Sequence, residues 1–433
     1  LVTGTTIVLL GLCAFAGLLT RRHSFFADLV FFALAAIGLA ATAGENEGTS
    51  EAFAVVIGLI TWLVVLRVLT EPVLRPKVPD ASRRAFLVRV GAVGVGAVAI
   101  AVIGQVAGGS RRAVEQARRL LRLPITRGAQ PAGADVGVSG IASWRTSASE
   151  FYKVGVEIVP PAIRPSEWTL RIHGMVDHEL TLTYADLVAR KFTEDWVTIC
   201  CVSNEVGGNL IGNAFWSGPL IRDVLAEVGI HPDADAVKQT SSDGWTCGTP
   251  VEALLDPQRN AMLAVAMNGE PLPVEHGFPV RMIVPGLYGY VSATKWLVDL
   301  EVTQFSQFQA YWTQNGWSEK GPVKTESRID VPRDGAGTKT GRVRVGGVAW
   351  SQHTGIEKVE YQVDGGSWQL AELGKVPSVD TWVQWAGTVD VDKGDHKLAV
   401  RATDKTGYTQ TPVRRDVVPN GATGWHTIDF HSS

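Results

Sequence analysis

Thr198-Ile-Cys-Cys201-Val-Ser-Asn204 is the stretch that decides the fold, and it continues a strand-like run that begins at Trp196. Two adjacent cysteines therefore stand at the end of a predicted strand. Neighbouring cysteines rarely bridge each other, and no second cysteine pair occurs at zinc-ligand spacing. The residues alone allow a disulfide from Cys200 or Cys201 to Cys247, or a lone thiolate ligand for a soft metal. Spacing does not decide between these two interpretations.

The composition of the 433-residue chain excludes several classes of protein. Four cysteines are too few for a small disulfide scaffold, and 45% hydrophobic residues exclude a disordered chain. A net charge of −3 argues against a nucleic-acid partner. The average hides two compositions, because residues 1–109 are mostly apolar runs and the remainder has a polar, globular pattern. The chain opens inside an apolar run without an initiator methionine, so we expect the natural protein to begin further upstream.

Four apolar stretches precede residue 110 and predict membrane-spanning helices, since a helix needs about 20 apolar residues to cross the hydrocarbon core. They lie at residues 1–20, 25–44, 52–66 and 90–109. Buried core helices are the alternative, and four such runs in a row disfavour it. Basic loops after the first and third runs predict the cytoplasmic side, so residues after 110 would lie outside the cytoplasm. An arginine-rich stretch that begins at Arg111 disagrees with this orientation.

Ser82-Arg83-Arg84-Ala85-Phe86-Leu87 precedes the last apolar run and resembles the twin-arginine export signal. The simpler alternative is a pair of flanking arginines on the cytoplasmic side. The match at the serine, phenylalanine and leucine positions favours export, which carries folded and often cofactor-loaded proteins across the bacterial inner membrane. The only histidine before His173 is His23, in a predicted loop, so these runs do not predict a haem site.

The remaining chain divides into three predicted parts. Residues 110–149 predict an amphipathic membrane-surface helix followed by a linker. Residues 150–325 alternate short strands with helices and predict an α+β domain, with strands at 168–173 and 180–183 and a helix at 220–228. Residues 326–433 contain short alternating strands separated by turn signals, which predict an immunoglobulin-like β-sandwich without the Cys–Trp–Cys signature of antibody domains.

The residues around Cys201, with four later segments in the same order, resemble the sulfite oxidase family of molybdopterin enzymes. These segments are residues 211–220, 267–273, 276–285 and 294–297. Residues 347–350 and 363–368 resemble that family's C-terminal dimerisation domain, so the resemblance covers roughly 150–420. The predicted fold class is therefore multi-domain: a transmembrane helical bundle (1–109), an α+β molybdopterin-binding domain (150–325) and a C-terminal immunoglobulin-like β-sandwich (326–433).

The resemblance implies roles for particular residues. Cys201 stands at the family's cysteine position, ahead of Asn204, and would ligate molybdenum through its thiolate, although a one-residue shift to Cys200 stays open. His276 and Arg281 match positions that hold the pyranopterin and its phosphate, and the planar fork of an arginine suits phosphate oxygens. The other residues implied to contact the cofactor are Tyr152, Lys153, Asn204, Asp243, Thr294 and Lys295.

Two departures from the family concern the substrate. Sulfite oxidases carry arginines after the Cys-x-x-Asn motif, whereas Glu205 stands there in this chain. A glutamate would repel a sulfite dianion. The expected active-site tyrosine is replaced around Trp317. The sequence therefore favours molybdopterin binding but not sulfite as the substrate.

The sequence thus predicts a bacterial enzyme, multi-pass in the cell membrane, with an extracytoplasmic molybdenum site for two-electron oxygen-atom transfer. Its expected partners are a small substrate of the sulfoxide or sulfur-oxyanion class, a separate electron-transfer protein, membrane lipid and a second copy of the chain, with no nucleic acid. One alternative is a membrane-tethered β-sandwich adhesion or binding protein with an empty cofactor fold. Another keeps the cofactor but uses Cys200 and Cys201 as a thiol redox pair.

Overall fold

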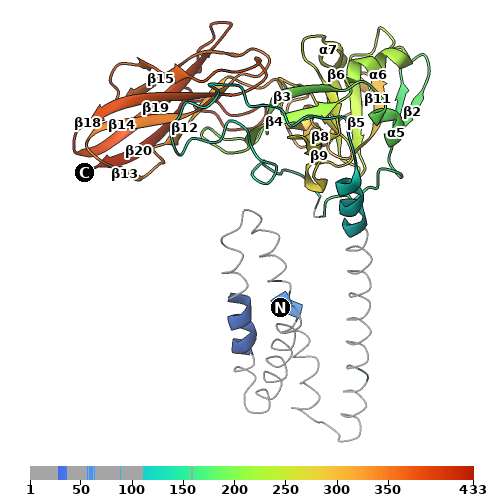
Figure 1. Ribbon diagram of the computed structural model, residues 1–433, viewed down its shortest axis with the longest axis horizontal. Coiled ribbons are helices and arrows are strands. Elements are labelled where there is room, and N and C mark those ends of the chain that lie inside the picture. The colour runs from blue at the N-terminus through green and yellow to red at the C-terminus, as the bar shows by residue number, and fades with distance from the viewer. Residues whose placement is uncertain are drawn as a thin grey trace, which may run out of the picture. The chain divides into compact units, whose positions relative to one another are not determined.

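The computed structural model describes residues 28–36, 56, 58–61, 63, 88, 111–157 and 159–433 (Figure 1). The chain divides into two compact units, residues 1–110 and residues 111–433. In the first unit every described residue is helical.

The predicted fold class is wrong in one part, the transmembrane helical bundle at residues 1–109. Within the described parts of the chain, no helix is both long enough and apolar enough to cross a membrane. The described helical residues 28–36 include the charged Asp28, which is costly in the hydrocarbon core of a bilayer. Most of the four apolar runs, and the whole motif at 82–87, lie outside the described residues. What the structure describes is mostly β.

After a helical segment at 111–120, the second unit builds a five-stranded sheet. Its strands in spatial order are β2 (Leu180–Thr183), β1 (Thr169–Gly174), β11 (Leu297–Thr303), β5 (Ala236–Ser241) and β6 (Thr246–Pro250). β1 runs parallel to β11, and the other pairs are antiparallel. The predicted strands at 168–173 and 180–183 are confirmed, because Leu170 and Ile172 are fully buried while Thr169 and Arg171 are exposed.

A second sheet carries the cysteine stretch. Its strands in spatial order are β3 (Thr193–Cys200), β4 (Ile211–Gly218), β8 (Ala266–Met267) and β9 (Glu270–Pro271). A two-stranded sheet of β7 (Met262–Ala264) and β10 (Arg281–Ile283) accompanies it. β4 is buried along its whole length, and β3 is buried from Trp196 onward. Cys201 therefore leaves β3 inside the protein, at the start of the β3–β4 connection.

Short helices and single turns connect these strands. They are α5 (Tyr184–Val188), α6 (Ile221–Val228), α7 (Val251–Leu255), α8 (Tyr311–Gln314) and the 3-10 turns η1 (Val274–His276), η2 (Gly289–Val291) and η3 (Phe305–Gln307). The predicted helix at 220–228 is confirmed by α6, whose Ile221, Val224, Leu225 and Val228 are buried at helical spacing. Two of the turns, η1 and η2, contribute residues to the pocket described below.

Residues after Thr325 form two facing sheets. One has the order β12 (Glu326–Val331), β14 (Gly341–Trp350), β18 (Val383–Val391) and β17 (Glu372–Leu373). The other has the order β13 (Ala336–Thr338), β20 (His426–Ser432), β19 (Gly394–Asp404), β15 (Ile356–Val363) and β16 (Gln369–Leu370). One hydrophobic cluster takes Val345 and Trp385 from the first sheet and Val400 and Phe430 from the second. The shared cluster makes this part a β-sandwich.

Candidate functional site

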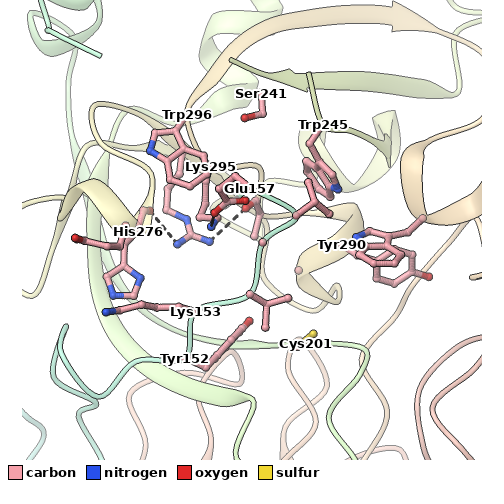
Figure 2. Close-up of a pocket in the computed structure, with 18 of the residues that line it drawn as sticks. Tyr152, Lys153, Glu157, Cys201, Ser241, Trp245, His276, Tyr290, Lys295 and Trp296 are labelled. Carbon is pink, nitrogen blue, oxygen red and sulfur yellow. Dashed lines mark hydrogen bonds and ion pairs between the residues drawn. The ribbon is translucent and has the colours of Figure 1, made fainter. Parts of the chain in front are cut away.

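A pocket with about 890 Å³ of empty space, partly continuous with solvent, collects residues from segments far apart in the sequence (Figure 2). They come from the loop at 151–157, the end of β3, the β5–β6 turn, η1, β10, η2, the approach to β11 and the region of α8. Seven of the nine residues implied by the sequence line it: Tyr152, Lys153, Cys201, Asp243, His276, Arg281 and Lys295.

Cys201 lines the pocket, whereas Cys200 does not. Successive side chains of a strand point to opposite faces, and Cys200 is buried in a hydrophobic cluster with Ile211 and Trp350. Burial raises the pKa of the Cys201 thiol, and hydrogen bonds with Ser203 partly oppose the rise. The cysteines at 200, 201 and 247 are all free, so the disulfide alternative is not realised in the structure.

Two predicted residues lie beside the pocket rather than on it. The Asn204 side-chain oxygen accepts a 2.8 Å hydrogen bond from the Leu210 amide, and the Asn204 amide donates to the Cys201 carbonyl at 3.0 Å. Asn204 thus fixes the backbone that follows Cys201. Thr294 is fully buried, with its hydroxyl 3.2 Å from the Cys247 sulfur.

Arg281 is the most deeply buried cation of the pocket, with 6% of its surface exposed. Its guanidinium donates to the carbonyls of His276 at 3.1 Å and Ala293 at 3.3 Å and lies 5.0 Å from the Trp216 ring. Burial lowers the pKa of Arg281 to about 10, so the group stays charged at neutral pH. Among the described residues no carboxylate pairs with Arg281, and its Nε has no hydrogen-bond partner.

His276 is held as a neutral imidazole. Burial lowers its pKa to about 4, and the charges of Arg281 and Lys153 act in the same direction. Its Nε2 lies 2.7 Å from the Ala148 carbonyl, which can only accept a hydrogen bond, so Nε2 carries the proton. The remaining ring nitrogen, Nδ1, is therefore a hydrogen-bond acceptor.

Lys295 is the second buried cation, and it has a carboxylate partner. Its Nζ donates to Glu157 at 2.8 Å and lies 4.2 Å from the centre of the Trp296 ring. Burial lowers the pKa of Lys295, while the contact with Glu157 raises it. Asp243 holds the β5–β6 turn, because its carboxylate accepts a 3.0 Å hydrogen bond from the Trp245 amide.

Aromatic residues form another part of the pocket wall. Figure 2 shows Trp245 and Tyr290 on its right and His276 and Lys153 on its left. The Tyr290 ring lies 6.0 Å from the ring of Trp317, which also lines the pocket. Burial raises the pKa of Tyr290 to about 12, so its hydroxyl is protonated and donates to the Ser318 carbonyl at 2.6 Å.

Sequence reasoning missed Glu157, Trp245 and Tyr290, which belong to no recognised motif. Trp245 follows the predicted Asp243 by two positions, and this short spacing is the one local signal that could have indicated it. Glu205, expected to repel an anionic substrate, is exposed and is absent from the pocket lining. Glu205 therefore gives no reason to exclude sulfite as a substrate.

The residues present fit an anionic cofactor that also offers a soft metal. A buried, unpaired guanidinium is costly unless an anion neutralises it, and Arg281 opens into the same pocket as Cys201. The uncharged Nδ1 of His276 can also accept a hydrogen bond from an N–H group of such a cofactor. The pocket thus presents the donor types expected for a phosphate-bearing pterin whose metal binds a thiolate.

Comparisons with known proteins agree with this fit. The family profile described as "Oxidoreductase molybdopterin binding domain" matches residues 157–312. The uncharacterized oxidoreductase YuiH of Bacillus subtilis (strain 168) is 34% identical over 156 residues, which cover 36% of this chain and 75% of YuiH. The mitochondrial sulfite oxidase of Drosophila melanogaster is 27% identical over 365 residues, which cover 72% of this chain and 63% of that protein.

The crystal structure of the sulfane dehydrogenase SoxCD from Paracoccus pantotrophus superposes with a TM-score of 0.59 at 23% identity, covering 66% of this chain and 81% of that chain. This likeness shows the fold alone. The chain belongs to the family of oxidoreductases with a molybdopterin-binding domain. The chain spans less than two thirds of the length of the Drosophila sulfite oxidase, and the cofactor of its matched domain is molybdenum–molybdopterin.

Proposed function

We propose that this protein catalyses two-electron oxygen-atom transfer on a small substrate in the pocket that contains Cys201. The observation that carries the proposal is that one pocket joins the free Cys201 to the buried cations Arg281 and Lys295. When bound, molybdenum–molybdopterin supplies the two-electron redox chemistry.

The residues of this chain would hold and orient the cofactor. Cys201 would ligate molybdenum through its sulfur. Burial favours the protonated thiol in the absence of a metal, and a bound metal cation would instead stabilise the thiolate. Arg281 and Lys295 would donate to phosphate oxygens. His276 would accept an N–H through Nδ1, since its other nitrogen already donates to Ala148. Each role uses a group that the fold has already fixed in charge or orientation.

We propose a sulfoxide rather than sulfite as the substrate. The cations Lys153, Arg281 and Lys295 would be used by the cofactor, whereas Trp245, Tyr290 and Trp317 also line the pocket. Aromatic rings favour a neutral group with apolar substituents over a dianion. Electrons would come from a separate redox protein, and the sandwich would contribute to a homodimer, as the family resemblance implies.

We further propose that the catalytic unit works at a bacterial cell membrane, outside the cytoplasm. The support is the sequence at 82–87 and its resemblance to a twin-arginine signal. Fractionation of cells, with protease added to intact spheroplasts, tests this location. Cleavage of residues after 110 by external protease is the expected result, and complete protection would contradict it.

The experiment that tests the proposed function measures molybdenum by elemental analysis and released pterin by fluorescence. About one molybdenum per chain is expected in the wild type. Cys201→Ser should lose the metal or alter its spectrum, because a hydroxyl is a poorer ligand for a soft metal than a thiolate. Cys200→Ala is the matched control, since the neighbouring cysteine does not line the pocket, and it should retain the metal.

Turnover is then compared for dimethyl sulfoxide, with a reduced dye as the electron donor, and for sulfite, with an oxidised dye as the acceptor. Faster turnover of the sulfoxide is expected. A wild-type protein without molybdenum or pterin, from cells that make the cofactor, would refute the proposed function. A faster reaction with sulfite would refute the proposed substrate and leave the cofactor assignment intact.

A further inference from the structure

The carboxylate of Glu157 lies inside the pocket and pairs with one of its two buried cations. Its Oε1 accepts a 2.8 Å hydrogen bond from Lys295 Nζ, and the side chains of Glu157 and Lys295 are only 11% and 16% exposed (Figure 2). Arg281, in contrast, pairs with no carboxylate among the described residues. One cation of the pocket is thus open to an anion, while the other is already neutralised by the chain itself.

The backbone around Gly155 allows this arrangement. A Cβ placed on Gly155 would collide with both carboxylate oxygens of Glu157. The carboxylate therefore folds back over a position where a side chain would collide with it. Residues 152–157 contain neither helix nor strand, and Val154 and Val156 are 43% and 41% exposed. The ion pair with Lys295, rather than regular secondary structure, holds Glu157 in the pocket.

A phosphate and the ionised Glu157 would compete for Lys295. A phosphate dianion beside an ionised carboxylate in a poorly solvated pocket is strongly repelled. Lys295 has little solvent to share between two anions, since it is largely buried and its Nζ lies 4.2 Å from the Trp296 ring. A bound phosphate would therefore exclude the carboxylate from this position.

We propose that Glu157 is an internal anion that occupies Lys295 in the cofactor-free protein and leaves when the cofactor's phosphate binds. The pair neutralises Lys295 until loading. This inference rests on the cofactor assignment, and it adds a competing residue that the assignment does not require. Its consequence is that Glu157 opposes loading although it lines the binding site.

Two variants remove the competing contact in different ways. Glu157→Gln keeps the size of the side chain and removes its charge. Gly155→Ala keeps the charge but places a methyl group against the carboxylate, and only the flexible end of Glu157 has to move. Gly155 does not have a positive φ, so alanine is compatible with its backbone. Glu150→Gln is the control, because Glu150 is an exposed carboxylate that bonds Ser147 and does not line the pocket.

The test uses the full chain purified from cells unable to make the cofactor and adds molybdopterin cofactor released from another molybdenum enzyme. Molybdenum and pterin per chain are followed over time, and amide hydrogen exchange of residues 152–157 is measured before loading. We expect Glu157→Gln and Gly155→Ala to load about tenfold faster than the wild type, since a charged hydrogen bond is worth roughly a factor of ten or more. Both should also exchange faster in this segment, and Glu150→Gln should behave as the wild type.

Equal loading and equal exchange in the wild type and both variants would overturn the inference while the proposed function stands. Slower loading of Glu157→Gln in a folded protein would overturn it as well, because Glu157 would then assist binding. A wild-type protein that takes up no cofactor would refute the proposed function and this inference together.

Discussion

Arg281 is surrounded by groups that accept some of its hydrogen bonds but do not neutralise its charge. Two backbone carbonyls accept from the guanidinium, and the ring of Trp216 lies 5.0 Å away. No carboxylate among the described residues neutralises it. A buried charge in this state costs stability, which is acceptable in a protein whose bound cofactor brings the missing anion.

This residue gives a prediction in which stability and binding move in opposite directions. Arg281→Gln removes the buried charge and keeps an amide that can donate to one carbonyl. We expect the cofactor-free variant to melt at the same temperature as the cofactor-free wild type or higher, while its molybdenum content falls at least tenfold. Differential scanning calorimetry and elemental analysis check the two parts. A variant that unfolds at lower temperature would show that the guanidinium is a structural group.

How well the sequence predicts the site also differs from residue to residue. Cys201, His276 and Arg281 could be predicted because they stand in recognisable motifs. Asn204 stands in the same motif, yet its side chain holds the backbone after Cys201 instead of facing the pocket. Glu157 could not be predicted, because its contact with Lys295 joins residues 138 positions apart.

At the scale of elements, β3 connects the site to the sandwich. Thr198, in the buried part of β3, donates its amide to the Asp380 carbonyl at 2.9 Å, and its hydroxyl accepts from the Trp382 amide at 2.8 Å. The same hydroxyl donates to the Asn213 side chain on β4 at 3.0 Å. The strand that ends beside Cys201 is therefore fixed on one edge by β4 and on the other by the segment that leads into β18.

Thr198→Val tests this connection. The substitution keeps the shape and the strand propensity of the side chain, but it leaves the Trp382 amide and the Asn213 oxygen without their buried partner. We expect a loss of about 1–3 kcal/mol in the free energy of unfolding, measured by urea denaturation. Thr193→Val, at the partly exposed start of the same strand, should lose much less. Equal losses in the two variants would contradict the proposed role of the Thr198 hydroxyl.

Elements with a local pattern were the predictable part of the fold. β1 and β2 show alternation, and α6 shows helical spacing of its buried residues, so their positions follow from the sequence. The order of the first sheet, β2-β1-β11-β5-β6, could not be predicted this way, because β11 inserts beside β1 from more than a hundred residues away. The pocket depends on that insertion, since Lys295 lies two residues before β11.

At the scale of the whole second unit, the sandwich and the pocket-bearing part meet through aromatic and charged contacts. Trp144 and Trp382 donate their ring N–H groups to each other's carbonyls, at 3.2 Å and 2.9 Å. His353, before β15, lies 3.2 Å from an Asp256 carboxylate oxygen at the end of α7 and 3.4 Å from one of Asp380. A protonated His353 therefore joins a carboxylate of the pocket-bearing part to a carboxylate of the sandwich.

His353 makes the stability of this junction depend on pH in a definite direction. The Asp380 carboxylate, with an oxygen 3.4 Å from His353 Nδ1, raises the pKa of His353 above its ordinary value of 6.5. A group whose pKa is higher in the folded protein than in the unfolded chain stabilises the fold. This stabilisation is complete at pH values below the pKa of the unfolded chain, and it disappears as the pH rises through the pKa of the folded protein. His353→Asn is the suitable change, because His353 has a φ of 66°, a conformation that asparagine tolerates well. We expect the variant to lose about 1 kcal/mol of unfolding free energy at pH 5.5 and almost nothing at pH 9, measured by urea denaturation at each pH.

His431→Asn, which removes an exposed pair with Asp395 inside the sandwich, is the control and should leave this pH profile unchanged. A loss for His353→Asn that is equal at both pH values would mean that His353 joins the two parts by packing and not by charge.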